Sequence, residues 1–204
     1  MKIKNTKQII IALEGIDGAG KSTLINLVCH RLNNQVEVYK RTKKGSIINY
    51  FVSIDFFKKH YMFLMPVYLL LSYKNYIVFK LTNQKKPIVI MDRCFLSNIC
   101  YFFPDAIINN KKLHVLLLFE VKLYPHAVFV LDVDPSVGLS RDGNKKTLEW
   151  LTSTRQAYLN IEKSQISDFV DVTTLPADLS LNEKADIIVN YINLRQEAKN
   201  TNGM

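Results

Sequence analysis

Short apolar runs alternate with longer segments of mixed polarity along this chain. The apolar runs have the length and β-branched content of buried strands, and they cover residues 9–13, 36–39, 88–91, 127–133 and 169–172. We interpret the longer segments as helices at about residues 21–33, 61–82, 97–102, 111–122, 135–140, 148–165 and 182–195. Strands that alternate with helices are typical of a parallel sheet covered on both faces. The pattern therefore predicts an α/β fold in which helices flank a central parallel sheet of about five strands.

The chain has the length of one domain. Its 204 residues suffice for one α/β domain with a full core, whereas two independent domains would each be cramped. Hydrophobic residues make up 48% of the chain and charged residues 22%, which excludes wholesale disorder. We expect a single domain over residues 1–204, with a polar patch built to move at 142–146 and a frayed polar tail at 196–204.

The most apolar segments are too short for secretion or for membrane insertion. The first apolar stretch, residues 9–13, is shorter than the core of a signal peptide. Residues 61–81 contain Pro66, Lys74 and Lys80, so their uninterrupted apolar part falls short of the ~20 residues that a bilayer span needs. We interpret this segment as a buried helix or as a dimer face.

Cysteine usage and charge exclude further classes of site and partner. An odd number of cysteines without a close-spaced pair argues against a disulfide framework or a zinc site and predicts reduced thiols in the cytoplasm; the cysteines are Cys29, Cys94 and Cys100. The formal net charge is +9, but lysines and arginines occur in short, scattered groups rather than in one stripe. This distribution favours ordinary surface charge over a nucleic-acid groove.

One segment carries a specific chemical signal. Residues 15–23 read Gly-Ile-Asp-Gly-Ala-Gly-Lys-Ser-Thr and follow the first predicted strand, which is the setting that the Gly-x-x-x-x-Gly-Lys-Ser/Thr phosphate loop requires. The glycines let successive backbone N–H groups point into one concavity, and the helix that follows directs its positive end there. Lys21 would reach the β- and γ-phosphate oxygens, and the Ser22 hydroxyl would bind the bridging Mg²⁺.

Residues that directly follow the other strands complete the list of candidates, since ligands of open parallel sheets lie beyond the carboxyl ends of the strands. These residues are Lys40 and Arg41 after the second strand, Asp92 and Arg93 after the third, and Asp134 and Arg141 after the fourth. Asp92 could hold Mg²⁺ through water or accept a proton, and Arg93 could clamp a phosphate with two donors. For the pair Asp132 and Asp134 we favour a structural role in the turn that begins at Pro135.

Four segments of the chain resemble known sequence motifs, and their occurrence in this order is a more specific signal than any one of them alone. They are residues 13–23, the pattern Asp92-Arg93-x-x-x-Ser97-x-x-x-Tyr101, the stretch Leu-Asp-Val-Asp-Pro-x-Val-x-Leu-x-Arg at 131–141, and Thr-Arg-Gln-Ala-Tyr-Leu at 154–159. They closely resemble the corresponding motifs of thymidylate kinases. The resemblance extends from about residue 9 to residue 161 and implies the P-loop NTPase fold.

The resemblance implies roles for residues on the acceptor side of the site. By resemblance, Asp17 would contact the sugar hydroxyl of the acceptor nucleotide, Arg41 and Arg93 would hold its phosphate, and Asp92 would serve both the metal and the acceptor. Ser97 and Tyr101 would line the nucleoside pocket.

The chain departs from the family pattern in the base pocket and in the lid. Cys94 stands where an aromatic residue is usual, Phe102 where glutamine is common, and Lys74 aligns with the arginine that reads the thymine carbonyl. The lid, about residues 141–150, is shorter than usual. Because the phosphate loop has Gly18 where some members carry an arginine, the resemblance implies a catalytic arginine from the lid, and that role would fall to Arg141, with Lys145, Lys146 and Arg155 as alternatives.

The motifs together predict a phosphotransferase that moves the γ-phosphoryl group of ATP to a nucleoside monophosphate, with dTMP as the expected acceptor. Two alternatives remain open: a kinase of a nucleoside or another small metabolite, and a nucleotide-binding protein without transfer activity. The expected cofactor is Mg²⁺, held by Ser22 and Asp92, and the expected catalytic residues are Lys21, Asp92, Arg93 and Arg141. The expected ATP-binding residues are Gly15, Asp17, Gly18, Ala19, Gly20, Lys21, Ser22 and Thr23. The expected acceptor-binding residues are Asp17, Arg41, Lys74, Arg93, Ser97 and Tyr101. By resemblance we expect a cytoplasmic homodimer, without nucleic-acid or membrane partners.

Overall fold

A parallel sheet forms the centre of the molecule. The computed structural model describes residues 8–33, 35–40, 79, 86–102, 104–108, 125–143 and 146–201. Within them, five strands pair in parallel in the order β2-β3-β1-β4-β5. The strands are β1 (Ile9–Glu14), β2 (Val36–Lys40), β3 (Ile88–Asp92), β4 (Ala127–Leu131) and β5 (Asp171–Leu175). The predicted α/β class and sheet are confirmed.

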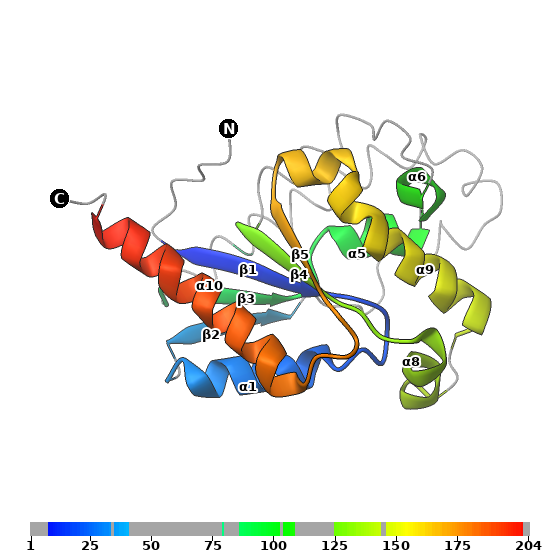
Figure 1. The fold of residues 1–204 in the computed structure, drawn as a ribbon, viewed down its shortest axis with the longest axis horizontal. Coiled ribbons are helices and arrows are strands. Elements are labelled where there is room, and N and C mark those ends of the chain that lie inside the picture. Colours follow the sequence, from blue (N-terminus) through cyan, green and yellow to red (C-terminus); the bar gives the residue numbers. More distant parts are fainter. Residues whose placement is uncertain are drawn as a thin grey trace.

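Helices cover both faces of the sheet. In the described part of the chain they are α1 (Lys21–Arg31), α5 (Leu96–Phe102), α6 (Pro104–Ile108), α8 (Pro135–Arg141), α9 (Leu148–Asn160), the 3₁₀ turns η2 (Ile161–Lys163) and η3 (Gln165–Asp168), and α10 (Leu181–Thr201). Figure 1 shows α1 and α10 on one side of the sheet and α5, α6 and α9 on the other.

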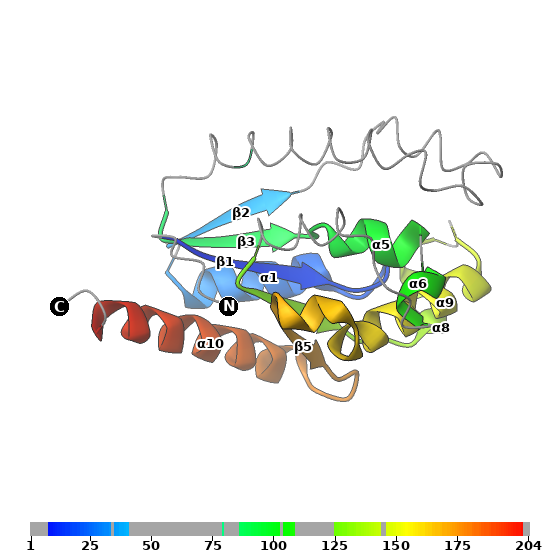
Figure 2. The ribbon, with the colours of Figure 1, turned by 90° about the horizontal axis from the view of Figure 1, so that it is seen from above.

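The apolar side chains of the strands alternate between the two faces of the sheet, so the core consists of two clusters, one on each face. Ile9, Ile11 and Leu13 of β1 pack against α1 and α10, whereas Ile10 and Ala12 pack against α5 and α9. Successive side chains of a strand point to opposite faces, so a continuous apolar run is the pattern that a strand buried on both faces requires. Seen from above, the carboxyl ends of β1 and β3 point the same way (Figure 2).

The order of the strands determines where a ligand can bind. After β1 the chain proceeds to β2 at one edge of the sheet, whereas after β3 it crosses to β4 on the opposite side of β1. The connections therefore diverge between the carboxyl ends of β1 and β3, and such a divergence opens a crevice in open parallel sheets.

Several predicted boundaries differ from the structure. The last strand is Asp171–Leu175 rather than 169–172, because Phe169 and buried Val170 belong to the turn before it and because this edge strand is only half-buried. The predicted helix 148–165 ends at Asn160 and continues as 3₁₀ turns. The short helix α6 was not predicted.

The prediction of a frayed tail is wrong for residues 196–201, because α10 continues through Thr201. The predicted helix 111–122 lies outside the described residues, as does the predicted helix 61–82 apart from Phe79, which is buried. The cysteines are free, as predicted. None of the helices in the described ranges is long and apolar enough to cross a membrane.

We expect Phe129→Ala to lower the free energy of unfolding by about 3–5 kcal/mol, because its ring is fully buried in β4 and packs edge-on against Tyr191 at 5.5 Å. Urea unfolding monitored by circular dichroism would measure the loss. Leu194→Ala is the matched control: the Leu194 side chain is 66% exposed, so its loss should stay within about 0.5 kcal/mol. Equal losses in the two variants would contradict the assigned core.

Candidate active site

The phosphate loop connects β1 to α1 and leaves the start of that helix open. Gly20 precedes α1 with a φ of 86°, a left-handed conformation that glycine adopts without steric cost. No side chain caps the helix at this position. The first backbone N–H groups of a helix have no partner within it, so here they are available to an anion.

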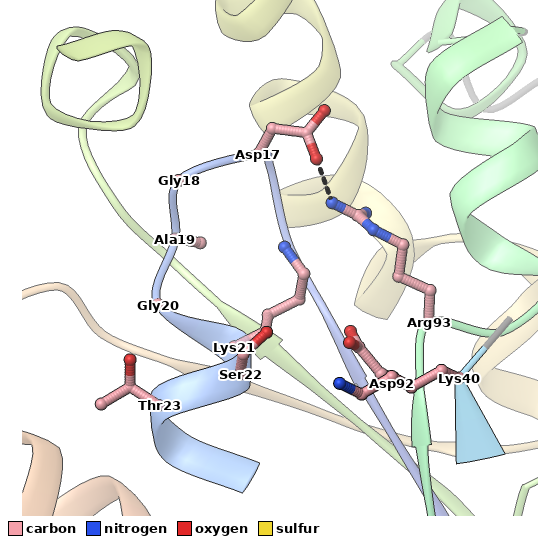
Figure 3. Close-up of a pocket in the computed structure, with 10 residues that line it drawn as sticks. All are labelled: Asp17, Gly18, Ala19, Gly20, Lys21, Ser22, Thr23, Lys40, Asp92 and Arg93. Carbon is pink, nitrogen blue, oxygen red and sulfur yellow. Dashed lines mark hydrogen bonds and ion pairs between the residues drawn. The ribbon is translucent and has the colours of Figure 1, made fainter. Parts of the chain in front are cut away.

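A cavity of about 340 Å³ lies at the carboxyl ends of β1, β2 and β3 (Figure 3). Its lining consists of the loop residues Asp17 to Thr23 together with Lys40, Asp92 and Arg93. The volume falls within the usual range for small-molecule sites. Residues predicted separately, from the loop and from the end of the third strand, therefore converge on one cavity.

Lys21 is buried and hydrogen-bonded to its own loop. Its Nζ donates to the carbonyl oxygens of Gly15 at 3.1 Å and Ile16 at 2.8 Å. Figure 3 shows the amine pointing toward Asp17 and Arg93. Burial, helped by the nearby Arg93 cation, lowers the pKa of Lys21 to about 7. The amine is therefore an unusually weak base until an anion joins it.

Arg93 is the second buried cation of the cavity. Its Nη2 donates to Asp17 Oδ1 at 2.6 Å, and its Nη1 donates to the Gly15 carbonyl at 3.0 Å and to Ser97 Oγ at 3.3 Å. The backbone has a φ of 73° at this residue, a conformation that costs a side-chain-bearing residue energy. The guanidinium lies over the Tyr101 ring, 5.0 Å from its centre. The surrounding protein thus fixes this side chain.

A fully buried carboxylate, Glu14, holds these parts together. Oε1 accepts the backbone N–H groups of Cys94 at 2.6 Å and Ser97 at 3.2 Å. Oε2 accepts the hydroxyls of Ser97 at 2.7 Å and Tyr158 at 2.9 Å, and it lies 3.8 Å from Arg93 Nη1. Sequence reasoning gave Glu14 no role. The signal that could have found it is an acidic residue at the end of an apolar strand.

An aromatic cluster borders Arg93. The Tyr101 ring contacts Trp150, with ring centres 4.8 Å apart, and meets Tyr158 edge-on at 6.2 Å. The Tyr101 hydroxyl is buried and makes no hydrogen bond within the described part of the chain. Ser97 and Tyr101, which were predicted to line the nucleoside pocket, both contact Arg93, and neither lines this cavity.

The candidate lid cations differ in their partners. Arg141 is exposed, and its Nη1 lies 3.4 Å from the Gly18 carbonyl of the phosphate loop. Lys146 lies over the Trp150 ring at 4.5 Å. Arg155 forms two hydrogen bonds with Asp132, at 2.6 and 2.9 Å. None of the three cations lines the cavity, including Arg141, which was predicted to be catalytic. Of these three cations, only Arg141 contacts the loop.

Asp132 and Asp134 have the structural roles that we favoured. Asp132 binds Arg155, and Asp134 accepts the Ser136 N–H at 2.8 Å and caps α8. Hydrogen bonds from Ser136 lower the pKa of Asp134.

The remaining predicted residues fall into two groups. Ser22 and Asp92, the expected metal ligands, both line the cavity. Lys40, to which the sequence analysis gave no role, lines it as well. Arg41, Lys74 and Lys145 lie outside the described residues.

Comparisons with known proteins agree with this site. The family model for thymidylate kinase matches residues 13–184. The thymidylate kinase of Francisella philomiragia subsp. philomiragia is 27% identical over 190 residues, which cover 87% of this chain and 92% of that protein. The thymidylate kinase of Ehrlichia ruminantium (strain Gardel) is 28% identical over 200 residues, which cover 91% of this chain and 98% of that protein.

A solved structure supports the fold. The deoxyadenosine kinase from M. mycoides, determined with bound dATP, superposes with a TM-score of 0.60 over 91% of this chain and 100% of that chain. At 19% identity, this likeness concerns the fold alone.

We expect Glu14→Gln to lower the free energy of unfolding by about 1–3 kcal/mol, because an amide replaces one of two acceptor oxygens and leaves buried donors without a partner. Chemical unfolding would measure this loss. The exposed Glu149→Gln is the matched control, with an expected change within about 0.5 kcal/mol. A Glu14→Gln protein as stable as the control would contradict the central role of this carboxylate.

Proposed function

The chain belongs to the thymidylate kinase family, and on that premise we propose that it transfers the γ-phosphoryl group of ATP to dTMP and forms dTDP. One observation carries the proposal: a complete phosphate loop and the Asp92–Arg93 strand end line the same cavity. A kinase needs two adjacent anion sites, one for the donor and one for the acceptor.

The donor side is formed by the phosphate loop. The backbone N–H groups at the start of α1 bind the β- and γ-phosphates, and Lys21 exchanges the Gly15 and Ile16 carbonyls for phosphate oxygens. The buried amine then gains the anionic partner that it lacks in the free protein.

The acceptor side is formed around Arg93. Its guanidinium binds the acceptor phosphate, while Asp17 accepts a hydrogen bond from the sugar hydroxyl. The Tyr101 hydroxyl, buried and without a hydrogen-bond partner among the described residues, supports a nucleoside pocket here, since such groups are rare in proteins. Arg41 and Lys74 complete the acceptor site in this proposal.

The residues present suit Mg²⁺ that arrives with the nucleotide. The described residues contain no group of three or more His, Cys, Asp or Glu side chains that could hold a metal. The cavity does offer the Ser22 hydroxyl and the Asp92 carboxylate, and Mg²⁺ commonly takes one or two such protein ligands together with phosphate oxygens. Bound there, the ion would neutralise charge on the β- and γ-phosphates.

The protein contributes position and charge to the reaction. An oxygen of the acceptor phosphate attacks the γ-phosphorus, the bond from that phosphorus to the β–γ bridging oxygen breaks, and ADP leaves. Lys21, Arg93 and Arg141 neutralise the charge on the transferring group. Closure of the segment after Arg141 excludes water, so that ATP is not hydrolysed. We also propose that the enzyme is a cytoplasmic homodimer.

An acceptor panel tests the function. With ATP and Mg²⁺, we expect dTMP to give the highest kcat/KM among nucleoside monophosphates and free nucleosides. Lys21→Ala, purified in parallel, should lose at least about 100-fold of the activity, and this control shows that the transfer belongs to the site. A panel in which dTMP is a poor acceptor would overturn the proposed substrate, and ATP binding without any product would overturn the proposed activity.

Binding of ATP should take up a proton. At pH 8 the Lys21 amine of the free protein is mostly neutral, because its pKa is lowered to about 7. Bound phosphates raise this pKa, so about 0.9 proton is taken up per ATP bound. Calorimetry with Mg²⁺ and a non-hydrolysable ATP analogue, in buffers of different ionisation enthalpy, measures this number.

The matched control for proton uptake is Lys21→Arg, because arginine stays protonated and binding should then be independent of the buffer. Proton release, or equal behaviour of the two proteins, would contradict the assigned role of the Lys21 amine.

A further inference from the structure

Helix α8 lies directly on the phosphate loop, with Gly138 of the helix against Gly18 of the loop. A Cβ atom built on Gly18 would lie 2.2 Å from the Gly138 carbonyl oxygen and 2.8 Å from Gly138 Cα. A Cβ atom built on Gly138 would lie 2.8 Å from the Asp17 carbonyl oxygen and 2.9 Å from Ile16 Cδ1. All four distances are below van der Waals contact. Helix α8 can therefore come this close to the phosphate loop only because neither Gly18 nor Gly138 has a side chain.

The same helix face carries Arg141. Residues three apart lie on one face of a helix, so the contact at Gly138 also determines how far the Arg141 guanidinium reaches. Its Nη1 lies 3.4 Å from the Gly18 carbonyl. The start of α8 is fixed as well, since Asp134 caps it and Pro135 occupies its first position.

The other candidate cations lie elsewhere. Lys146 lies over Trp150, and Arg155 is bound by Asp132. An arginine at position 18 would collide with the backbone of α8 while the helix is docked in this way. Among these positions, Arg141 is the one from which a guanidinium meets the loop.

We propose that Gly138 is a positioning residue, whose missing side chain lets α8 dock on the phosphate loop and thereby holds Arg141 over the transferring phosphoryl group. This inference rests on the proposed function, which it deepens. The close contact between Gly18 and Gly138 means that an arginine which joins Lys21 on the donor side comes from helix α8 rather than from position 18 of the loop.

A methyl group on Gly138 should displace Arg141 without removing it. To restore ordinary contacts of 3.4–4 Å, α8 has to retreat from the loop by roughly 0.5–1 Å. A misplacement of about 1 Å in a catalytic constellation can cost about 100-fold in rate. The loss should appear in kcat, with little change in KM, because the interaction strengthens in the transition state.

The test is a double-mutant cycle between Gly138→Ala and Arg141→Met. We expect Gly138→Ala to lower kcat by about 10- to 100-fold in the native background and by less than about 3-fold when Arg141 is already methionine. Ser140→Ala, on the same helix and outside the site, is the control and should stay within about 2-fold. Ile16→Val removes one of the colliding atoms and should restore part of the Gly138→Ala loss.

The outcomes separate this inference from the function on which it rests. Equal losses in both backgrounds would mean that the methyl group disturbs the loop itself, and no loss in the native background would mean that the contact does not position Arg141. Either result overturns the inference and leaves the kinase function intact. A Gly138→Ala protein that fails to fold, even with Ile16→Val, also overturns it. If native protein transfers no phosphoryl group to any acceptor, the function fails, and the same cycle is read from the affinity for ADP with aluminium fluoride, which mimics the transferring phosphoryl group; additive effects there overturn the inference.

Discussion

The site depends on the hydrogen bonds and the opposite charge that surround the buried carboxylate of Glu14. A charge out of water is tolerated only where hydrogen bonds and an opposite charge replace hydration. Glu14 has both, since it accepts four hydrogen bonds and lies 3.8 Å from Arg93 Nη1. Its donors come from the turn after β3, from α5 and from α9. One side chain at the end of β1 thereby joins the strand that precedes the phosphate loop to Arg93, α5 and α9.

The two buried cations of the cavity illustrate how a site for anions stays folded without them. Lys21 donates to carbonyls of its own loop, and Arg93 donates to Asp17 and to one of the same carbonyls. Arg93 thus already has an ionised partner in Asp17. The partners of Lys21 are neutral carbonyls, which stabilise its charge less than a phosphate would, because hydrogen bonds between ionised groups are the stronger ones. The lowered pKa of Lys21 reports this deficit. Ligand binding therefore exchanges partners within a preformed arrangement.

The residues that sequence reasoning identified are those whose role is encoded locally. The phosphate loop is one contiguous motif after a strand, and Asp92 and Arg93 end a strand, so the topology of a parallel sheet brings them together. Glu14 also ends an apolar strand, which marks it as a candidate, but its role could not be predicted because its partners lie 80 to 144 positions away. Edge strand β5 was misplaced because its half-buried residues lack a continuous apolar run. The left-handed backbone of Arg93 has no signature in the residue type either.

Gly138 did carry a signal in the sequence. A glycine inside a helix costs about 0.5–1 kcal/mol relative to alanine, so its presence in a helix of only seven residues calls for a reason in packing. The structure supplies that reason, since the Asp17 carbonyl oxygen and the Ile16 side chain of the phosphate loop leave no room for a methyl group on Gly138. A side chain at position 18 of the loop and helix α8 would need the same space, so the protein can have only one of them there. In this chain the helix occupies that space, and the proposed role of Arg141 follows from this packing, because position 18 has no room for a side chain.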